Sequence, residues 1–513
     1  MILLSTQKRT HLVWPNLHES AMKELKHKVI HGGLSKIGAQ AINFALRLGS
    51  LMVLSRLLDP KDFGLVAMAT VITGIFGLFK DAGLSMATVQ CATISHEQMS
   101  MLFWINILVG LILASVLIAA APVVADFYHE PRLIWVMTAL AADFLFAGAA
   151  AQHSALLQRQ MRFGTIAVID IITLVIGISV AIVMAVKGFG YWALVGQIVT
   201  MPCISAVCTW AVVRWKPGLP SRKTSIRAMV RFGGMVTLNG LVVHIAYNLE
   251  KILLGRFLGA QVLGTYERAY QLISIPSENI NSSIAGVAFS ALSRIQDDPL
   301  RQKRYFLKGY TLLVALTLPI TIGCAVFAED MIFVLLGAKW KEAAPIFRLL
   351  APTIVIFGLI NPFGWFLYAT GRAGRSLKIA FVIAPLVVVS YFIGLPYGAS
   401  GVALAYSSAM ALWVIPHIAW CIRGTGISAQ DILQAVSRPF VSGLVSAGLA
   451  VSVQFYFGQL LSPFLHLALG GSVMLVSYLC MLLYIMGQKA FYLDFFRALK
   501  MPSSINDNGS AVI

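Results

Sequence analysis

Apolar residues dominate this chain in runs that are about as long as a lipid bilayer is thick. A helix needs about 20 largely apolar residues to cross a bilayer, and such runs recur from Gly33 to Gly487. The pieces between them are short and rich in turn-forming residues, as at Asp59-Pro60-Lys61-Asp62. The pattern predicts an all-α polytopic membrane protein with about fourteen transmembrane helices. The predicted spans are 33–55, 63–90, 102–125, 133–157, 164–186, 190–213, 233–257, 263–291, 307–328, 343–369, 377–396, 400–422, 436–458 and 464–486.

The composition excludes a water-soluble protein. Of 513 residues, 58% are hydrophobic and 12% are charged, whereas a soluble domain carries about 25% charged residues. Such a chain would have too little polar surface to cover a soluble fold. The six cysteines lie mostly inside apolar runs and form no CxxC pair with nearby histidines. We therefore expect one membrane domain, with no disulfide, metal site or cofactor.

Lysine and arginine are distributed unevenly between the loops on the two sides. With the N-terminus inside and an even number of crossings, the inner segments hold 27 of these residues and the outer loops hold 7. Cytoplasmic loops carry such an excess. The asymmetry predicts that both termini are cytoplasmic and that the turns at 56–62 and 258–264 face outward. The net charge of +18 is then mostly an orientation signal, and no nucleic-acid partner is expected.

Residues 1–28 allow two interpretations. They are basic but lack the apolar core and the small-residue cleavage site of a secretory signal. The segment is either a basic amphipathic stretch on the inner membrane face, or an upstream extension of a chain that starts at Met22. We favour the second interpretation.

The sequence resembles itself at an offset of 200 residues. Residues 55–64 align without a gap with 255–264, so that Gly64 falls on Gly264, and Gly33 falls on Gly233. Each copy joins the first helix of a set to the second, which predicts six helices per repeat. Because six is even, the two copies share one orientation and are related by an axis along the membrane normal, an arrangement in which transporters place their cargo between the halves.

The repeat divides the chain into predicted regions. Two helices follow the second copy, and polar segments flank and join the copies. The regions are a basic cytoplasmic N-terminal segment (1–28), a first six-helix lobe (29–215), a basic cytoplasmic linker (216–231), a second six-helix lobe (232–422), two additional helices (436–486) and a cytoplasmic tail (487–513).

Several motifs resemble those of one transporter family. They are residues 55–64, Asp81-Ala82-Gly83-Leu84-Ser85, residues 121–128, residues 258–269 and Leu336-Gly337-Ala338-Lys339-Trp340. On these residues the chain resembles the polysaccharide transporter, or Wzx-type flippase, branch of the superfamily that also contains multidrug exporters and peptidoglycan lipid flippases. The resemblance extends from about Lys28 to the end of the twelfth predicted helix.

The resemblance implies a fold and a cargo. The fold is a V-shaped bundle of two six-helix lobes around a central cavity that opens to one face at a time. The cargo is an oligosaccharide on an undecaprenyl diphosphate carrier, moved from the cytoplasmic to the outer leaflet of a bacterial inner membrane. The implied partners are this lipid-linked oligosaccharide, membrane lipids, and the polymerase and chain-length machinery of a surface polysaccharide.

Basic residues inside the predicted spans are the first candidates for cargo contact. A charge at the bilayer centre is costly and usually faces an interior or water. Arg47 is eight residues before Ser55, about 12 Å deep at 1.5 Å per residue, with no acid within four positions. A diphosphate requires cationic donors, so we expect cargo contacts at Arg47, Lys80, Lys251 and Arg268. The structural alternatives are snorkelling, an interfacial position or an ion pair with another helix.

Acidic residues inside the spans have a different expected role. They either couple transport to protons or sodium, or pair with the basic residues, as Arg47 could with a carboxylate such as Glu250. The four candidates are Asp143, Asp170, Glu250 and Glu267. Two histidines are possible proton sites, although a lone helical histidine is more often satisfied by packing: His153 and His244.

Two other function classes compete with a flippase. A multidrug exporter would share the lobes and the repeat, but its cargo is usually cationic and favours an acidic cavity. A membrane polymerase or ligase needs a sizeable catalytic loop, and the longest predicted outer loop, 329–342, is short. No phosphate-binding P-loop motif is present. We expect no catalytic residues, and energy from an ion gradient, the membrane potential or consumption of the cargo.

Overall fold

Polar residues mark where helices begin. In the computed structural model of the chain, the Ser95 side chain accepts a hydrogen bond from the backbone N–H of Gln98 at 3.1 Å, and the Gln98 side chain accepts one from the N–H of Ser95 at 2.9 Å. This reciprocal capping box satisfies two otherwise unpaired donors. Asp298 accepts from the N–H of Arg301 at 3.0 Å, ahead of a helix with proline at its first position.

The structure describes residues 40–80, 88, 94–219, 227–295, 298–457, 462–490 and 492–493. Side chains are not described at 227–247, 282–287, 289–291, 373, 377 and 457. The predicted segment 1–28, the motif at 81–85, the side chain of His244 and the tail after 493 therefore lie outside the described residues. The described part contains helices and no strand, which confirms the predicted all-α class.

The first group of helices covers residues 40–213. Residues 40–57 are helical, and the helices that follow are α2 (Pro60–Gly77), α4 (His96–Tyr128), α5 (Leu133–Leu140), α6 (Ala142–Arg159), α7 (Phe163–Val186) and α8 (Trp192–Val213).

The second group begins with a long kinked helix and ends at Ile422. Its helices are α9 (Arg227–Arg294), α10 (Pro299–Val326), α11 (Ala328–Leu336), α12 (Ala343–Leu350), α13 (Pro352–Ala369), α14 (Ala373–Gly394) and α15 (Gly398–Ile422), with short 3₁₀ turns at Ala338–Trp340 and Leu395–Tyr397. Then come α16 (Ala429–Phe457), α17 (Pro463–Cys480) and a π-helical turn at Met481–Ile485.

Some predicted spans are interrupted. The span predicted at 133–157 breaks between α5 and α6, and the one at 343–369 breaks before Pro352, whose missing N–H cannot continue the hydrogen-bond ladder. In α9 the break is Gly259, with φ +82° and ψ 176°, a conformation that favours glycine. This kink separates the two helices predicted at 233–257 and 263–291.

The chain is a multi-pass membrane protein. Within the described residues, nine helical stretches are long and apolar enough to cross a membrane. One of them, Gly374–Ile422, contains both α14 and α15. The number of crossings therefore stays a prediction, as do the boundaries of the regions.

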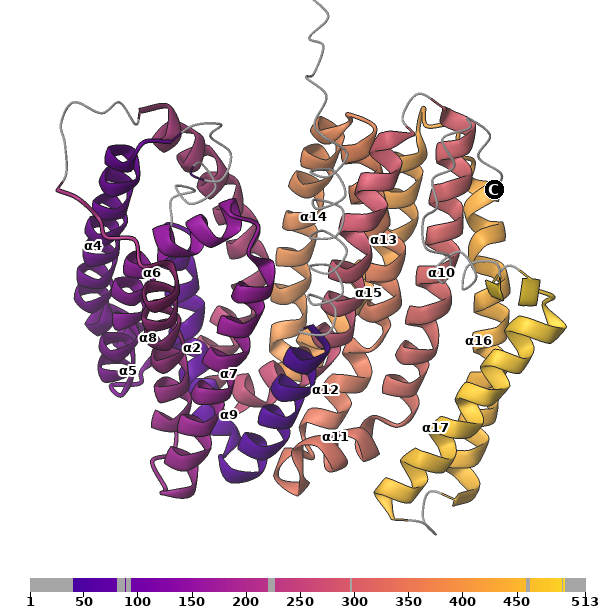
Figure 1. Cartoon of the computed structure of the whole chain (residues 1–513). Coiled ribbons are helices and arrows are strands. Elements are labelled where there is room, and N and C mark those ends of the chain that lie inside the picture. Colours follow the sequence, from indigo (N-terminus) through magenta and orange to yellow (C-terminus); the bar gives the residue numbers. More distant parts are fainter. Residues whose placement is uncertain are drawn as a thin grey trace, which may run out of the picture.

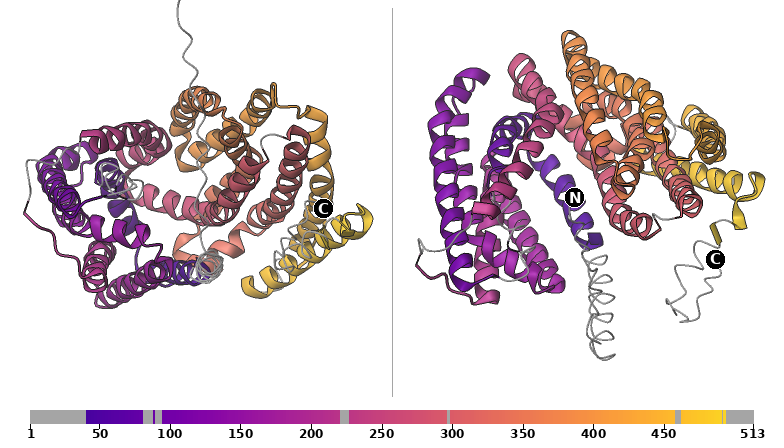
Figure 2. Two further views of the ribbon diagram at one scale, coloured as in Figure 1. Left: turned by 45° about the horizontal axis from the view of Figure 1, so that its top comes forward. Right: turned by 90° about the horizontal axis from the view of Figure 1, so that it is seen from above.

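The helices form two groups with a pair of helices at one side. Figure 1 shows α2, α4, α5, α6, α7 and α8 together, and α10, α13, α14 and α15 together beside them. The helix at 40–57 lies between the groups. α16 and α17 lie on the far side of the second group, where α16 packs on α10, and the view from above shows the same arrangement (Figure 2).

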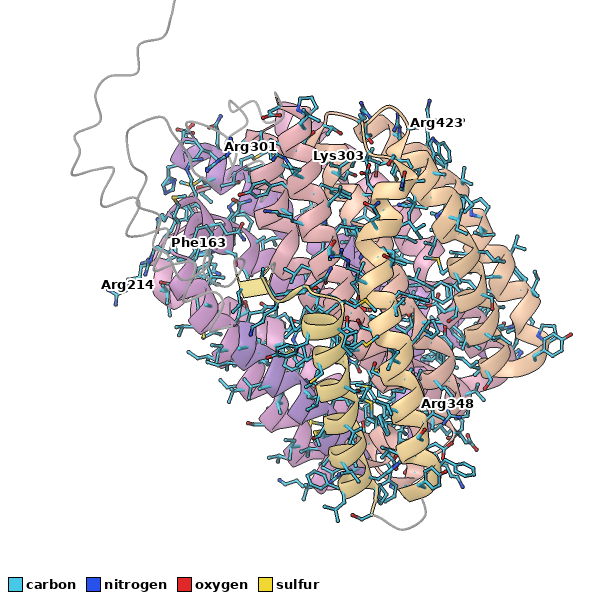
Figure 3. All side chains as sticks on the ribbon, turned by 90° about the vertical axis from the view of Figure 1, so that its right-hand side faces the viewer. Phe163, Arg214, Arg301, Lys303, Arg348 and Arg423 are labelled. Carbon is cyan, nitrogen blue, oxygen red and sulfur yellow. The ribbon has the colours of Figure 1, made fainter. Side chains whose placement is uncertain are left out.

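Labelled cations mark the two ends of the bundle in one view. Arg301, Lys303 and Arg423 lie at one end, whereas Arg348 lies toward the other (Figure 3). We call the first the basic end. The opposite end carries the turn at 58–60, the kink at Gly259 and the segment 337–342, and we call it the turn end.

The two groups touch at the turn end through equivalent positions of the repeat. A Cβ atom built on Gly64 would lie 1.7 Å from the carbonyl oxygen of Ala260, and one built on Gly264 would lie 1.9 Å from that of Pro60. Residues 60 and 260, and 64 and 264, are repeat partners. The contact between α2 and the second half of α9 is therefore reciprocal, as the predicted axis between the copies requires.

Side chains extend this contact around the turn end. Arg56 donates to the carbonyl of Val334 at 2.8 Å, and the Trp340 indole donates to the carbonyl of Ser55 at 2.7 Å. Lys339 and Asp59 form an ion pair at 2.8 Å. Away from the turn end, the side-chain amide of Gln40 donates a hydrogen bond to the side-chain oxygen of Asn279 at 3.2 Å.

Candidate functional site

Two of the predicted site residues meet in the first group of helices. The Lys80 ammonium donates to both carboxylate oxygens of Asp143, at 2.9 and 3.0 Å. Lys80 follows the end of α2, and Asp143 lies in the first turn of α6. Both side chains are about one third exposed, at 30% and 28%. The ammonium has three donors, so it keeps capacity for a further anionic partner.

A cleft of about 260 Å³ adjoins this ion pair. It lies between Gly77, Leu78 and Lys80 at the end of α2 and one face of α6. The α6 residues recur at helical spacing and are mostly small: Ala147, Ala151, Ser154, Ala155 and Gln158. The cleft therefore combines a cation with walls that leave room for a ligand.

Arg47 and Asp170 form a second neighbourhood. Both side chains are exposed, and the Arg47 guanidinium acts electrostatically on the Asp170 carboxylate. Arg47 is on the helix between the groups, and Asp170 is on α7. The electrostatic partner of Arg47 in the structure is thus Asp170, whereas the sequence suggested a carboxylate such as Glu250.

The charges that flank Gly259 pair with each other. The Lys251 ammonium donates to Glu267 at 3.1 Å and lies 5.7 Å from the centre of the Tyr270 ring. Glu250 is 2% exposed and lies near Tyr391 of α14, and its Oε2 atom has no hydrogen-bond partner within the described part of the chain. In this conformation Lys251 and Glu267 join the two halves of α9, the structural alternative that the sequence left open.

Arg268 lies where the two groups meet. Its guanidinium is 4.3 Å from the centre of the Phe63 ring in α2, a favourable distance for a cation–π contact. Its Nε atom is buried and has no hydrogen-bond partner within the described part of the chain. Arg268 therefore belongs to the contact at the turn end, and Phe63 packs in turn against Trp340 at 5.3 Å.

His153 is accounted for by packing. It is fully buried, one ring nitrogen is 3.1 Å from the carbonyl oxygen of Trp215, and the ring stacks on Trp210 at 4.3 Å. No group of three or more His, Cys, Asp or Glu residues that could hold a metal ion occurs among the described residues.

The sequence reasoning missed several polar residues. Glu278 is exposed on α9 inside a predicted span, so the rule that selected Arg47 should have selected it too. Asn281, Asn361 and Trp365 line a recess in the second group. They are uncharged, and a search for charges in apolar runs does not find them.

Comparison with known proteins identifies the family and the fold. Residues 53–345 match the model of a family described as polysaccharide biosynthesis protein. The chain is 27% identical over 396 residues to the lipopolysaccharide biosynthesis protein WzxC of Escherichia coli K12, covering 74% of this chain and 78% of the relative. It is 28% identical over 453 residues to the teichuronic acid biosynthesis protein TuaB of Bacillus subtilis, covering 82% and 87%.

A solved structure has the same arrangement of helices. The lipid II flippase MurJ, in an inward closed conformation, superposes with a TM-score of 0.70 at 13% identity, covering 92% of this chain and 99% of that one. This likeness extends to the fold, and the family match covers more than half of the sequence. The chain therefore belongs to the polysaccharide biosynthesis protein family.

Proposed function

We propose that this protein flips an undecaprenyl-diphosphate-linked oligosaccharide across a bacterial inner membrane, from the cytoplasmic to the outer leaflet, by alternating access. The family relatives are named for polysaccharide biosynthesis, and MurJ is named a lipid flippase. Both termini are cytoplasmic in this proposal, so the basic end faces the cytoplasm and the turn end faces outward. The polymerase and chain-length machinery would receive the cargo.

The observation that carries the proposal is the Lys80 cleft and its position. α2 runs from Pro60 at the turn end to Gly77, about 27 Å at 1.5 Å per residue, so Lys80 follows the end of α2 that is nearer the basic end. A lipid diphosphate enters from that side, and an ammonium beside a 260 Å³ cleft is suited to bind it.

A route for the diphosphate follows from the positions of the cations. The anion first competes with Asp143 for the Lys80 ammonium, which is already 30% exposed. Arg47 lies deeper, about 12 Å from the turn end, and its exposed guanidinium receives the diphosphate next. The contact of Gly64 with Ala260 then opens, because it is a close backbone approach between the groups at the outer side.

The four acids supply candidate coupling sites. Asp143 and Glu267 are in ion pairs, and Glu250 is buried near Tyr391. When the cargo binds a cation that is paired with an acid, that acid loses its partner and is then able to accept a proton or a sodium ion. Asp170, exposed near Arg47, is placed to respond in the same way. Lys251 and Arg268 contact cargo only after their present partners separate.

Cationic residues at the cleft and between the groups favour an anionic cargo over the cationic cargo of a multidrug exporter. Deletion of the gene followed by lipid analysis tests this choice. The proposal predicts that one diphosphate-linked oligosaccharide accumulates in the inner leaflet and that a surface polysaccharide is lost. Unchanged glycolipids with increased dye sensitivity would support the exporter, and intact transport with an unpolymerised product would support an enzyme.

A further inference from the structure

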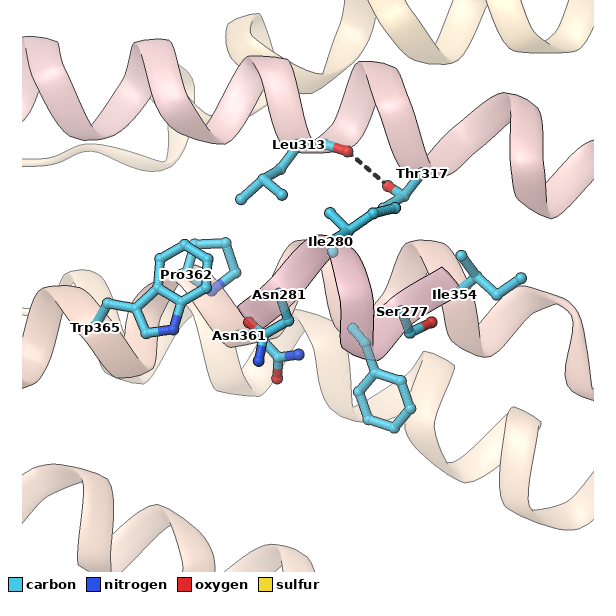
Figure 4. A pocket seen from close by; sticks show the side chains of 11 residues that line it. Ser277, Ile280, Asn281, Leu313, Thr317, Ile354, Asn361, Pro362 and Trp365 are labelled. Atoms are coloured by element: carbon cyan, nitrogen blue, oxygen red, sulfur yellow. Dashed lines mark hydrogen bonds between the residues drawn. The ribbon is translucent and has the colours of Figure 1, made fainter. Parts of the chain in front are cut away.

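A recess in the second group is lined by uncharged polar side chains. Ser277 and Asn281 come from α9, and Asn361 and Trp365 come from α13 (Figure 4). Each pair is four residues apart and so shares one helix face. Thr317 of α10, whose hydroxyl donates to the carbonyl of Leu313 at 2.9 Å, and apolar residues of α9, α10 and α13 complete the lining, and none of the lining residues among those described is charged.

This recess is the repeat partner of the Lys80 cleft. The offset of 200 residues places Ser277 on Gly77 and Ile280 on Lys80, and these four residues line the two sites. The same part of the repeat therefore builds one wall of each site.

The other wall of each site is also equivalent in the repeat. It comes from α13 in the recess and from α6 in the Lys80 cleft, and the two helices align at an offset of 210 residues. The N–H of Arg162 donates to the carbonyl of Leu157 after α6, and the N–H of Arg372 donates to that of Leu367 after α13. Between these bonds, Met161 and Gly371 have φ of 53° and 70°. The helices α6 and α13 thus end in the same way, which fixes their alignment.

With this alignment three lining residues of one wall fall on three lining residues of the other. Phe357, Asn361 and Trp365 of α13 fall on three α6 residues that line the Lys80 cleft, and the α6 residues are Ala147, Ala151 and Ala155. Small residues beside an ammonium in the first site are thus replaced in the second by an amide and an indole.

The chemistry of the recess selects a neutral ligand. Amide groups inside a membrane span need hydrogen-bond partners, yet the Oδ1 atom of Asn281 is buried and unpartnered within the described part of the chain. An amide both donates and accepts, as sugar hydroxyls do, and an indole offers a flat apolar face. A phosphate would find no cation here.

We propose that this recess binds the sugar part of the cargo, while the repeat-equivalent Lys80 cleft binds its diphosphate. The inference rests on the proposed function and assigns one part of the cargo to each lobe. The enclosed space is about 10 Å³, room for about one water-sized group. It accepts a hydroxyl or hydroxymethyl group, and the sugar ring lies outside it against Trp365. Asn279 of α9 accepts a hydrogen bond from Gln40 of the central helix at 3.2 Å, so α9 contacts that helix at the level of the recess, through the helix face opposite to that of Asn281.

Binding to the purified full chain in lipid nanodiscs tests the division. One probe is undecaprenyl diphosphate without sugar, and the other is the lipid-linked oligosaccharide extracted from a strain lacking the gene. The double variant Asn281→Leu/Asn361→Leu should weaken binding of the oligosaccharide lipid about tenfold, the loss of two or more neutral hydrogen bonds, and leave undecaprenyl diphosphate unaffected. Trp365→Leu should act in the same direction.

A matched control is Trp135→Leu, because Trp135 is 68% exposed on α5 and distant in sequence from the recess. The Trp135→Leu variant should bind both probes as tightly as the unaltered protein does. Unchanged binding of undecaprenyl diphosphate also shows that the recess variants are folded. If the double variant binds the oligosaccharide lipid as tightly as the unaltered protein, the recess is not a sugar site. If the unaltered protein binds neither probe, the proposed function itself fails.

Discussion

The reciprocal glycine contact at the turn end should control which face of the protein is open. Gly64→Ala would place a Cβ atom 1.7 Å from the carbonyl oxygen of Ala260. The two helices must separate by about 1.3 Å before that distance reaches 3.0 Å, the shortest contact that real Cβ atoms tolerate. Overpacking of this kind costs about 1 to 3 kcal/mol.

The cost falls only on the conformation in which the turn end is closed. A shift of 1 to 3 kcal/mol changes the ratio of closed to open molecules about 5-fold to 150-fold. Gly264→Ala should change this ratio to a similar extent, because its Cβ atom would lie 1.9 Å from the carbonyl oxygen of Pro60. Both variants should therefore favour the form that is open at the turn end and reduce flipping.

A chemical cross-link measures the closed form. In a chain whose six native cysteines are replaced, Asp59→Cys and Lys339→Cys stand where an ion pair now spans 2.8 Å. Because the lysine side chain is much longer than that of cysteine, a bifunctional maleimide joins the two thiols in place of a direct disulfide. Gly64→Ala should lower the cross-linking yield in this background. Gly309→Ala is the control, since a Cβ atom there meets nothing within 4 Å. Equal yields in the two variants would refute the idea that these helices separate during transport.

Three further predictions concern charged residues. Lys251→Ala or Glu267→Ala alone should lower the level of folded protein, because a partly buried charge without its partner costs about 3 to 5 kcal/mol, and the double variant should restore that level. If the losses of thermal stability in the two single variants simply add in the double variant, measured by thermal unfolding in membranes, the pair is not stabilising. Lys80→Ala should abolish most flipping, and adding Asp143→Asn should restore protein level but not surface polysaccharide per molecule; recovery of both would make Lys80 merely structural. Arg47→Lys should keep partial flipping and Arg47→Ala should lose most of it, measured as surface polysaccharide per membrane protein; full activity in Arg47→Ala would contradict its contact with the diphosphate.

The sequence predicted the helices because bilayer length and apolar composition constrain each segment separately. The kink at Gly259 lies inside the turn that the repeat had located. The break between α5 and α6 was not predicted, because it interrupts a run that stays apolar throughout. The predicted span from 63 was also too late, since Pro60 is already the first helical residue of α2.

Partners of the charged residues could not be predicted in the same way. Lys80 and Asp143 are 63 residues apart, and no local rule relates two helices at that separation. The repeat held more information than the charges did. It maps Lys80 onto Ile280, but the offset grows from 200 to 210 before Asn361, so a gap-free comparison loses the second wall of the recess.

Transport in a reconstituted system tests flipping most directly. Proteoliposomes would carry the oligosaccharide lipid from the deletion strain in both leaflets, and a membrane-impermeant reagent would oxidise the sugars that it can reach. Flipping by the protein should make nearly all of the sugar reactive over time, and Arg47→Ala should slow that conversion at equal protein content. A lipid whose headgroup cannot cross the apolar core unaided stays in its own leaflet, so that only the outer half of the sugar reacts. If the reactive fraction stays at about half in the presence of the protein, the protein does not flip this cargo.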